Sequence, residues 1–212
     1  MAILSGGLIR KRLKLGIDDQ GCLNITPLLD IDAAIDRDSI DLRLGCHFLL
    51  PRVPPTAALL PGATSSWSSH LHVHVPYGRY LVLPAHQTVL GATLEFIKLP
   101  PDLSGQVLTK SSVARTFCIV ETAPWIHPNY RGCLTLEIAN VSNTALLLYP
   151  GRFICQLVLQ SIEDFSPAGK LDGTYLGPVY PEAPRFRDPE EDLGDIGVSA
   201  VERPRFDRQP DR

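Results

Sequence analysis

A short hydrophilic stretch between residues 109 and 115 has a composition suited to binding phosphate. It reads TKSSVAR, which places two serine hydroxyls and two cations within seven residues. Such groups bind phosphate oxygens, an arginine through two parallel hydrogen bonds and a lysine as a point charge. A serine-rich turn with flanking charges is also common in proteins without a ligand, so this signal alone is weak.

A single carboxylate, Glu137, stands in the apolar stretch GCLTLEIAN. Alternate residues of a strand face opposite sides, so the aliphatic side chains after Cys133 would share one face and Glu137 the other. From this strand alone, an exposed glutamate on a solvent face is the favoured interpretation. A functional carboxylate is the alternative.

The loop between these two stretches reads TAPWIHPNYRG, from residue 122 to residue 132, and contains two prolines. Proline restricts the backbone and stiffens a loop. This loop could therefore present carbonyl and amide groups to a planar base in fixed positions.

Metal-ligating residues give a weaker signal. His70, His72 and His74 alternate in HLHVHV and would face one side of a strand, where they could bind a metal ion or simply be exposed. The five cysteines form no CxxC pair, so neither a zinc knuckle nor a redox motif is indicated. We expect Cys133 and Cys155 to be small core residues, and reduced thiols fit a cytoplasmic protein.

Short strands must position these groups. One helix is expected from Ser5 to about Leu15, with Ser5 as its cap and Leu8, Ile9 and Leu13 near one face. Beyond it, 19 prolines and 16 glycines separate short β segments, which is typical of a sandwich, barrel or jelly roll. The expected strands are Ser39–Leu44, His70–Val75, Tyr80–Leu83, Thr88–Phe96, Ser104–Thr109, Gly132–Asn140 and Arg152–Gln160.

The length of 212 residues suits one domain, and the net charge of -3 leaves no broad basic field for nucleic acid. No stretch approaches a membrane span, and the start does not read as a secretory signal. The four cations between residues 10 and 14 favour a solvated helix face over a membrane-binding patch. Residues 51–69 are expected to be irregular. Residues 1–185 would form the domain and residues 186–212 a charged, flexible tail.

Several motifs, taken in order, resemble the dCTP deaminase family, relatives of the trimeric dUTPases. The resemblance runs from ILSGGLI to about Pro184. It rests on SIDLRLG (39–45), LPAHQTVLGATLEFIKLPPDLSG (83–105), KSSVAR (110–115), TAPWIHPNYRGCLTLE (122–137) and PGRFICQLVL (150–159). It implies an all-β fold, a distorted jelly roll (β-clip) of the dUTPase type. It also implies a homotrimer with active sites at subunit interfaces, and Mg²⁺ bound chiefly through the nucleotide triphosphate.

The same resemblance implies roles for individual residues. Glu137 takes the place of the catalytic glutamate, and burial on its apolar strand would favour the protonated form that such a shuttle needs. Ser111 and Arg115 match residues that position the water, the glutamate and the ligand. Residues that would bind the nucleotide are Lys110, Ser112, Ala123, Gln156 and Tyr175. Activation of water would need no zinc, and the H-x-E…P-C-x-x-C signature of zinc deaminases is absent from the sequence.

Four departures from the family pattern matter. Lys110 stands where arginine is usual, and His127 stands where the family has an aspartate that helps to hydrolyse dUTP. Trp125 occupies a variable place, where it could stack on a ligand or pack. The C-terminal motif DGTYLGPVYP keeps Tyr175 but lacks the usual glutamine. We therefore expect deamination of dCTP to dUTP and ammonia. The alternatives are a bifunctional enzyme that gives dUMP, or a nucleotide-binding regulator on the same fold.

Overall fold

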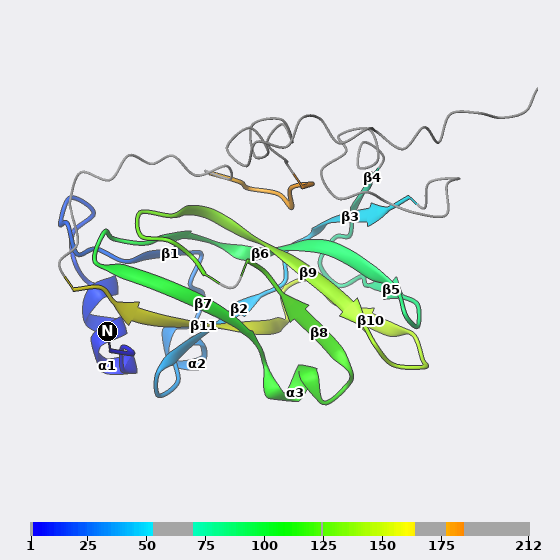
Figure 1. Cartoon of the computed structure of the whole chain (residues 1–212), viewed down its shortest axis with the longest axis horizontal. Helices are drawn as coiled ribbons and strands as arrows, with labels where there is room; N and C mark the ends of the chain where they lie inside the picture. Colours follow the sequence, from blue (N-terminus) through cyan, green and yellow to red (C-terminus); the bar gives the residue numbers. More distant parts are fainter. Residues whose placement is uncertain (1, 53–69, 124, 164–176, 185–212) are drawn as a thin grey trace, which may run out of the picture. The chain divides into compact units, whose positions relative to one another are not determined.

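Strands form from short apolar runs, and many of these runs are separated by turns that contain proline or glycine. The computed structural model describes residues 2–52, 70–123, 125–163 and 177–184 (Figure 1). Eleven strands and three short helices lie within these residues, so the predicted all-β class is confirmed. Tyr175, the tail 186–212 and residues 53–69 of the expected irregular stretch lie outside the described residues.

All strand pairings are antiparallel. One sheet has the order β4-β3-β6-β9-β8, with β1 paired to β6; a second has the order β2-β11-β7, and β10 pairs with β5. The strands are β1 (Asn24–Thr26), β2 (Ser39–Arg43), β3 (His47–Pro51), β4 (His70–His74), β5 (Leu81–Leu83), β6 (Thr88–Lys98), β7 (Leu103–Thr109), β8 (Cys118–Glu121), β9 (Arg131–Asn140), β10 (Leu146–Leu148) and β11 (Phe153–Ser161). All seven predicted strands are present to within two residues at each end, whereas β1, β3, β8 and β10 were not predicted.

The core collects the inward side chains of these sheets. Leu42 of β2, Leu136 of β9 and Leu157 of β11 are each 0% exposed. Burial of one such side chain stabilises the fold by roughly 1.5–3 kcal/mol. Cys133 and Cys155 are also buried, at 4% and 0% exposure, which confirms their predicted place in the core.

The predicted N-terminal helix is present as α1 (Gly6–Leu13). Ile9 is fully buried and Leu13 packs against the core, but Leu8 is 50% exposed, so only part of the predicted apolar face is buried. Ser5 occupies the capping position, yet its side chain makes no capping hydrogen bond. Tertiary packing through Ile9 therefore holds the helix more than its cap does.

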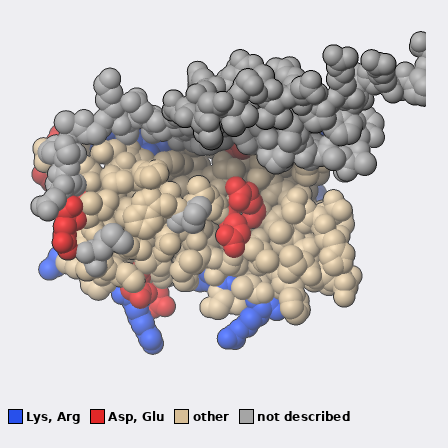
Figure 2. Space-filling model, in the orientation of Figure 1, with Lys and Arg blue, Asp and Glu red and all other residues tan. Residues whose placement is uncertain are grey.

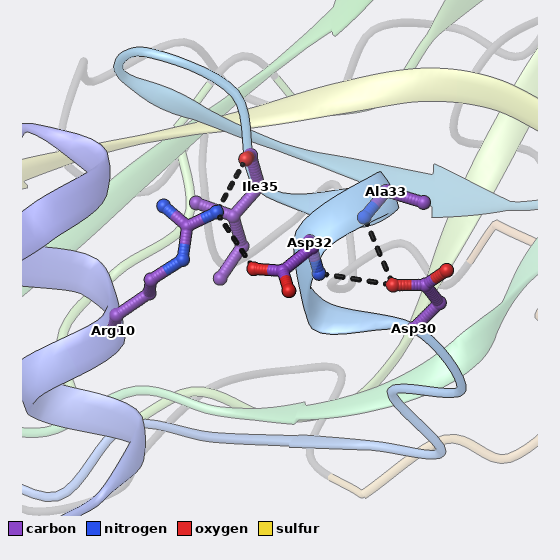
Figure 3. A network of polar contacts seen from close by, with 5 residues as sticks. All are labelled: Arg10, Asp30, Asp32, Ala33 and Ile35. Carbon is purple, nitrogen blue, oxygen red and sulfur yellow. Dashed lines mark hydrogen bonds and ion pairs between the residues drawn. The ribbon is translucent and has the colours of Figure 1, made fainter.

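Arg10 connects α1 to the next helical turn (Figure 3). Its Nη2 donates to the carbonyl oxygen of Ile35 at 3.0 Å and lies 3.5 Å from Oδ1 of Asp32. Asp30 caps α2 (Ile31–Ala34) by accepting two backbone hydrogen bonds of 3.0 Å each. Arg10 is therefore bound within the chain and only partly solvated, whereas Lys11 and Lys14 are exposed, as a solvated face requires.

A buried ion pair joins two of the motif segments. Glu95, in β6, is 0% exposed, and its carboxylate accepts from the backbone amide of Arg43 at 2.8 Å and from Nη1 of Arg43 at 3.2 Å. Burial raises the pKa of Glu95, and the hydrogen bonds and charge of Arg43 oppose that shift. The Arg43 guanidinium also lies 4.1 Å from the ring centre of Phe153. This pair is structural, because it is enclosed by the core.

Candidate active site

The predicted phosphate-binding stretch forms a single helical turn, α3 (Ser111–Ala114), between β7 and β8. The amide of Ala114 donates to the carbonyl of Lys110 at 2.8 Å, and that of Arg115 donates to Ser111 at 3.1 Å. Residues four apart on a helix are neighbours, so Ser111 and Arg115 lie on one side of the turn. Ser111, Ser112 and Arg115 are all exposed, and the turn therefore presents two hydroxyls and a guanidinium to solvent.

The strand before the turn is tied to the strand after it by one side chain. The hydroxyl of Thr109 donates to the carbonyl of Val120 at 2.7 Å and accepts from the amide of Val120 at 2.9 Å. These two bonds connect β7 to β8 directly below α3. The turn is therefore fixed at its base, as a preorganised anion site requires.

Lys110 points back to the sheet rather than out with the serines. Its Nζ forms an ion pair with Asp41 of β2 and lies 5.5 Å from the ring centre of Phe153. Asp41 is the direct partner of Gln156 in the β2–β11 register, so the two side chains share one face. The structure thus brings Lys110 and Gln156 together through Asp41, which the sequence reasoning missed although it lies within SIDLRLG.

Glu137 lies on β9, where its register partners are Leu90 on one side and Glu121 on the other. Its side chain is exposed, as the strand pattern alone predicted, so the burial expected for a catalytic glutamate is wrong. No described residue forms a hydrogen bond or an ion pair with its carboxylate. Glu121 is exposed as well, and Figure 2 shows acidic side chains grouped over β8 and β9.

Burial along this face of β9 decreases from Cys133 to Glu137. The amide of Cys133 donates to the carbonyl of Pro178 at 2.7 Å, and the hydroxyl of Thr135 accepts from the amide of Glu182 at 3.1 Å. Residues 177–183 therefore cover the first half of this face, as far as Thr135. This local cover explains why Cys133 is buried while Glu137 is exposed.

The turn and Glu137 do not meet within this chain. In the β8–β9 register, Cys118 pairs with Asn140 near α3, and Glu121 pairs with Glu137 at the other end. Three residues of strand span about 10 Å. The two predicted groups of catalytic residues therefore lie at opposite ends of β8.

The loop 122–130 starts at the Glu137 end of β8. Ala123 and His127 are exposed, Trp125 is half-buried, and Pro124 lies outside the described residues. Between them, Ile126 is 4% exposed and exchanges hydrogen bonds of 2.8 and 3.0 Å with Gly105. The buried backbone bridge at Ile126 thus fixes the loop between exposed Ala123 and exposed His127.

The end of this loop is also closely packed. The hydroxyl of Tyr130 donates to the carbonyl of Cys133 at 2.9 Å. Gly132 has a φ of +146°, and a Cβ atom there would lie 2.4 Å from Cδ of Pro178. A glycine is therefore required where the loop enters β9 beneath residues 177–183.

The family model described as dCTP deaminase-like matches residues 3–162. The chain belongs to the dCTP deaminase-like family. A relative named "dCTP deaminase, dUMP-forming", from Methanothermobacter thermautotrophicus, is 33% identical over 199 residues, which cover 90% of this chain and 97% of that protein. Another, named dCTP deaminase, from Natronomonas pharaonis, is 34% identical over 200 residues, which cover 91% and 99%.

The fold agrees with this membership. The crystal structure of 2'-deoxycytidine 5'-triphosphate deaminase from Agrobacterium tumefaciens matches with a TM-score of 0.58 at 24% identity. The match covers 76% of this chain and 48% of that chain, so this chain spans about half the length of that structure. The dUTPase-like fold implied by the sequence motifs is confirmed for the dCTP deaminase-like domain.

The three alternating histidines of this dCTP deaminase-like protein lie on β4. His70, His72 and His74 pair with Pro51, Leu49 and His47, so the three imidazoles share one face of β4, as predicted. Within the described residues, no group of three or more His, Cys, Asp or Glu side chains is arranged to hold a metal ion.

A second cation of α1, besides Arg10, is bound within the chain. Arg12 forms an ion pair with Asp102 and donates to the carbonyl of Gly21 at 3.1 Å. In the part of the chain that the structure describes, no helix is long and apolar enough to cross a membrane.

Proposed function

We propose that the protein catalyses the hydrolytic deamination of dCTP to dUTP and ammonia, without zinc. The observation that carries the proposal is that both Glu137 and the Ser111–Arg115 turn are exposed, in a chain whose relatives are named dCTP deaminases. Each group is accessible, and each is held by fixed backbone. A site shared between subunits would bring the two together.

Glu137 would act as the proton shuttle. Its carboxylate takes a proton from a water molecule as the water oxygen attacks C4 of cytosine, and delivers that proton to N3. The second proton of the water then passes through the same carboxyl group to the amino nitrogen. The C4–N bond breaks, ammonia leaves, and a carbonyl remains at C4. Water is the only co-reactant, so the atoms balance.

The proposed assembly is a homotrimer in which Ser111 and Arg115 of one subunit face Glu137 of the next. Apolar side chains beside α3 support a partner at this edge: Phe117 is 62% exposed, Val141 48% and Ile119 38%. Exposed apolar groups that cluster in this way are typical of interfaces. Light scattering should give three times the subunit mass. A monomer that deaminates dCTP would contradict the shared site.

The triphosphate would bind at the turn through Ser112 and Arg115. Lys110 would join them after breaking its ion pair with Asp41. Ala123, Trp125 and Gln156 would lie against the rest of the nucleotide, with Tyr175 from the C-terminal region. Hydroxyls and cations suit phosphate oxygens rather than a metal ion, so Mg²⁺ fits this site as part of the nucleotide. Its contribution when bound is to neutralise phosphate charge.

The second candidate is a bifunctional enzyme that forms dUMP and pyrophosphate. The name of the Methanothermobacter relative, "dCTP deaminase, dUMP-forming", favours it. His127 is exposed in the loop and, with an imidazole, can serve as a base near neutral pH. Its shape and charge differ from those of the aspartate in the family pattern, which favours dUTP as the end product.

One assay separates these functions. The protein is incubated with Mg²⁺ and dCTP, dCMP or dUTP between about pH 6 and pH 9, and nucleotides and pyrophosphate are quantified. The proposal expects dUTP from dCTP and no pyrophosphate from dUTP. Formation of dUMP with pyrophosphate would establish the bifunctional enzyme. Binding of dCTP with no product at any pH would refute deamination and support a nucleotide-binding regulator.

A further inference from the structure

The strands β3 and β4 carry a cluster of imidazoles on one face. His47 is the register partner of His74, and Nδ1 of His47 lies 3.1 Å from Nε2 of His72. The ring centre of His47 lies 5.1 Å from that of His72 and 4.8 Å from that of His74. Two imidazole nitrogens at hydrogen-bond distance need one donor and one acceptor. The contact between His47 and His72 is therefore lost when both facing nitrogens carry protons.

Tyr180 packs on this cluster from a separate segment. Its ring meets that of His47 edge-on with the centres 4.3 Å apart, and lies 6.1 Å from His72. Tyr180 belongs to residues 177–183, part of the segment drawn in orange in Figure 1. Backbone hydrogen bonds hold that segment on β9, one from Gly177 to Arg131 at 2.8 Å and the Cys133–Pro178 bond described above. The imidazoles thus support the segment at a second place.

Burial and the two neighbouring imidazoles change the pKa of His47 in the same direction. Partial burial, followed by the charges of His74 and His72, lowers the pKa of His47. Neither β3 nor β4 carries any ionisable side chain other than its histidines, which include His70. On the covering segment the ionisable groups are Tyr180 and Glu182. The cluster therefore accumulates repulsion as it takes up protons.

We propose that His47, His72 and His74 form a proton-sensitive support for Tyr180, which holds residues 177–183 on the sheet near neutral pH and releases them in mildly acidic solution. The sign follows from linkage. A histidine that binds protons less well when docked contributes its stabilisation above the ordinary histidine pKa of about 6.5 and loses it as the pH falls. Because this segment covers Cys133 and Thr135, its release would uncover the part of β9 next to Glu137.

The test is hydrogen exchange of the amides of Gly177 and Glu182 at about pH 7.5 and about pH 5.5, corrected for intrinsic rates. The amide of Leu136, within β9, serves as the internal reference for global opening. Protection of the two segment amides should fall several-fold relative to Leu136 at the lower pH, because proton uptake by the cluster favours release of the segment. Equal protection at both pH values would overturn the proposal.

Variants assign the effect to the cluster. The double variant His47→Gln, His72→Gln removes the titration and should reduce the pH-dependent change to less than about twofold, given the same linkage. Tyr180→Ala, at a side chain that is 53% exposed, should raise exchange at about pH 7.5 and remove its pH dependence. The matched control is His86→Asn, at an exposed histidine that contacts Asn143 and has a φ of 59°, which asparagine tolerates. It should behave like the wild type. A full pH response in the double variant or in Tyr180→Ala would exclude this cluster as its origin.

Discussion

Glu95 and Glu137 lie on the adjacent strands β6 and β9, and both come from motifs in which a threonine precedes the glutamate by two residues. Glu95 is fully buried and bound by Arg43, whereas Glu137 is exposed and has no partner among the described residues. The first carboxylate is satisfied within the chain. The second is accessible, as the proposed role in catalysis requires. The difference shows that two glutamates in similar motifs can differ completely in burial, because their surroundings differ.

The largest expected effect comes from Glu137→Gln, which tests whether the exposed carboxylate takes part in catalysis. Loss of the proton shuttle should lower kcat for dCTP deamination by roughly 10²–10⁴-fold, the usual contribution of general acid–base catalysis. The melting temperature should not fall, because Glu137 makes no hydrogen bond or ion pair among the described residues. Steady-state kinetics and thermal unfolding measure both. Unchanged turnover would remove Glu137 from the mechanism.

Arg43→Met tests the structural carboxylate. Removal of one partner leaves Glu95 charged and buried, which should lower the free energy of unfolding by about 3–5 kcal/mol. Since burial raises the pKa of Glu95, lower pH lets it take up a proton and lose its charge. The loss of stability should therefore be smaller near pH 5 than near pH 8. Urea unfolding at a fixed protein concentration measures it, with the exposed Arg152→Met as control. A pH-independent loss would show that Glu95 is not the cause.

Gly132→Ala tests the cover that separates the buried end of β9 from its exposed end. The added Cβ would meet Pro178 at 2.4 Å on a backbone with a φ of +146°. We expect a loss of about 1–3 kcal/mol in the free energy of unfolding. We also expect faster alkylation of Cys133, a thiol whose pKa burial raises to about 11. Chemical unfolding and mass spectrometry measure the two effects.

The matched control for this change is Gly78→Ala. Gly78 also has a positive φ, of +82°, but no atom lies within 4 Å of its added Cβ. It should show only backbone strain and unchanged labelling of Cys133. If both alanine variants behave alike, the contact with Pro178 is not what protects β9.

The sequence was sufficient for the class of fold and for the longer strands, because alternation over seven or more residues is a strong signal. It missed β10 and β8, which have only three and four residues and are formed by pairing with β5 and β9. It placed Glu137 on the correct face of its strand, and the strand pattern alone predicted its exposure, whereas the apolar character of the strand wrongly suggested burial. The exposure of this face depends on where a segment some 40 residues later in the chain stops covering the strand. Local pattern carries no information on such contacts.

The candidate site shows the same limit at Lys110. Its charge and its place at the start of the turn were visible in the sequence, and a role in phosphate binding followed from them. Its partner Asp41 lies 69 residues earlier and meets it only because β2 and β7 both pair with β11. Motifs therefore predicted which residues form the site, and strand pairing determined which of them touch.

The smallest expected effect comes from Glu121→Gln. Glu121 and Glu137 are direct partners on β8 and β9, and like charges in such positions are destabilising by roughly 0.2–1 kcal/mol. Neutralising Glu121 should therefore raise the free energy of unfolding slightly at low salt, and by less at high salt, where the repulsion is screened. Introduced into Glu137→Gln, the same change should give no further gain, because the repulsion is already gone. Additive gains in the double variant would mean that the two carboxylates do not interact. Glu137 would then differ from Glu95 only in lacking a cation beside it among the described residues, and not in being repelled by Glu121.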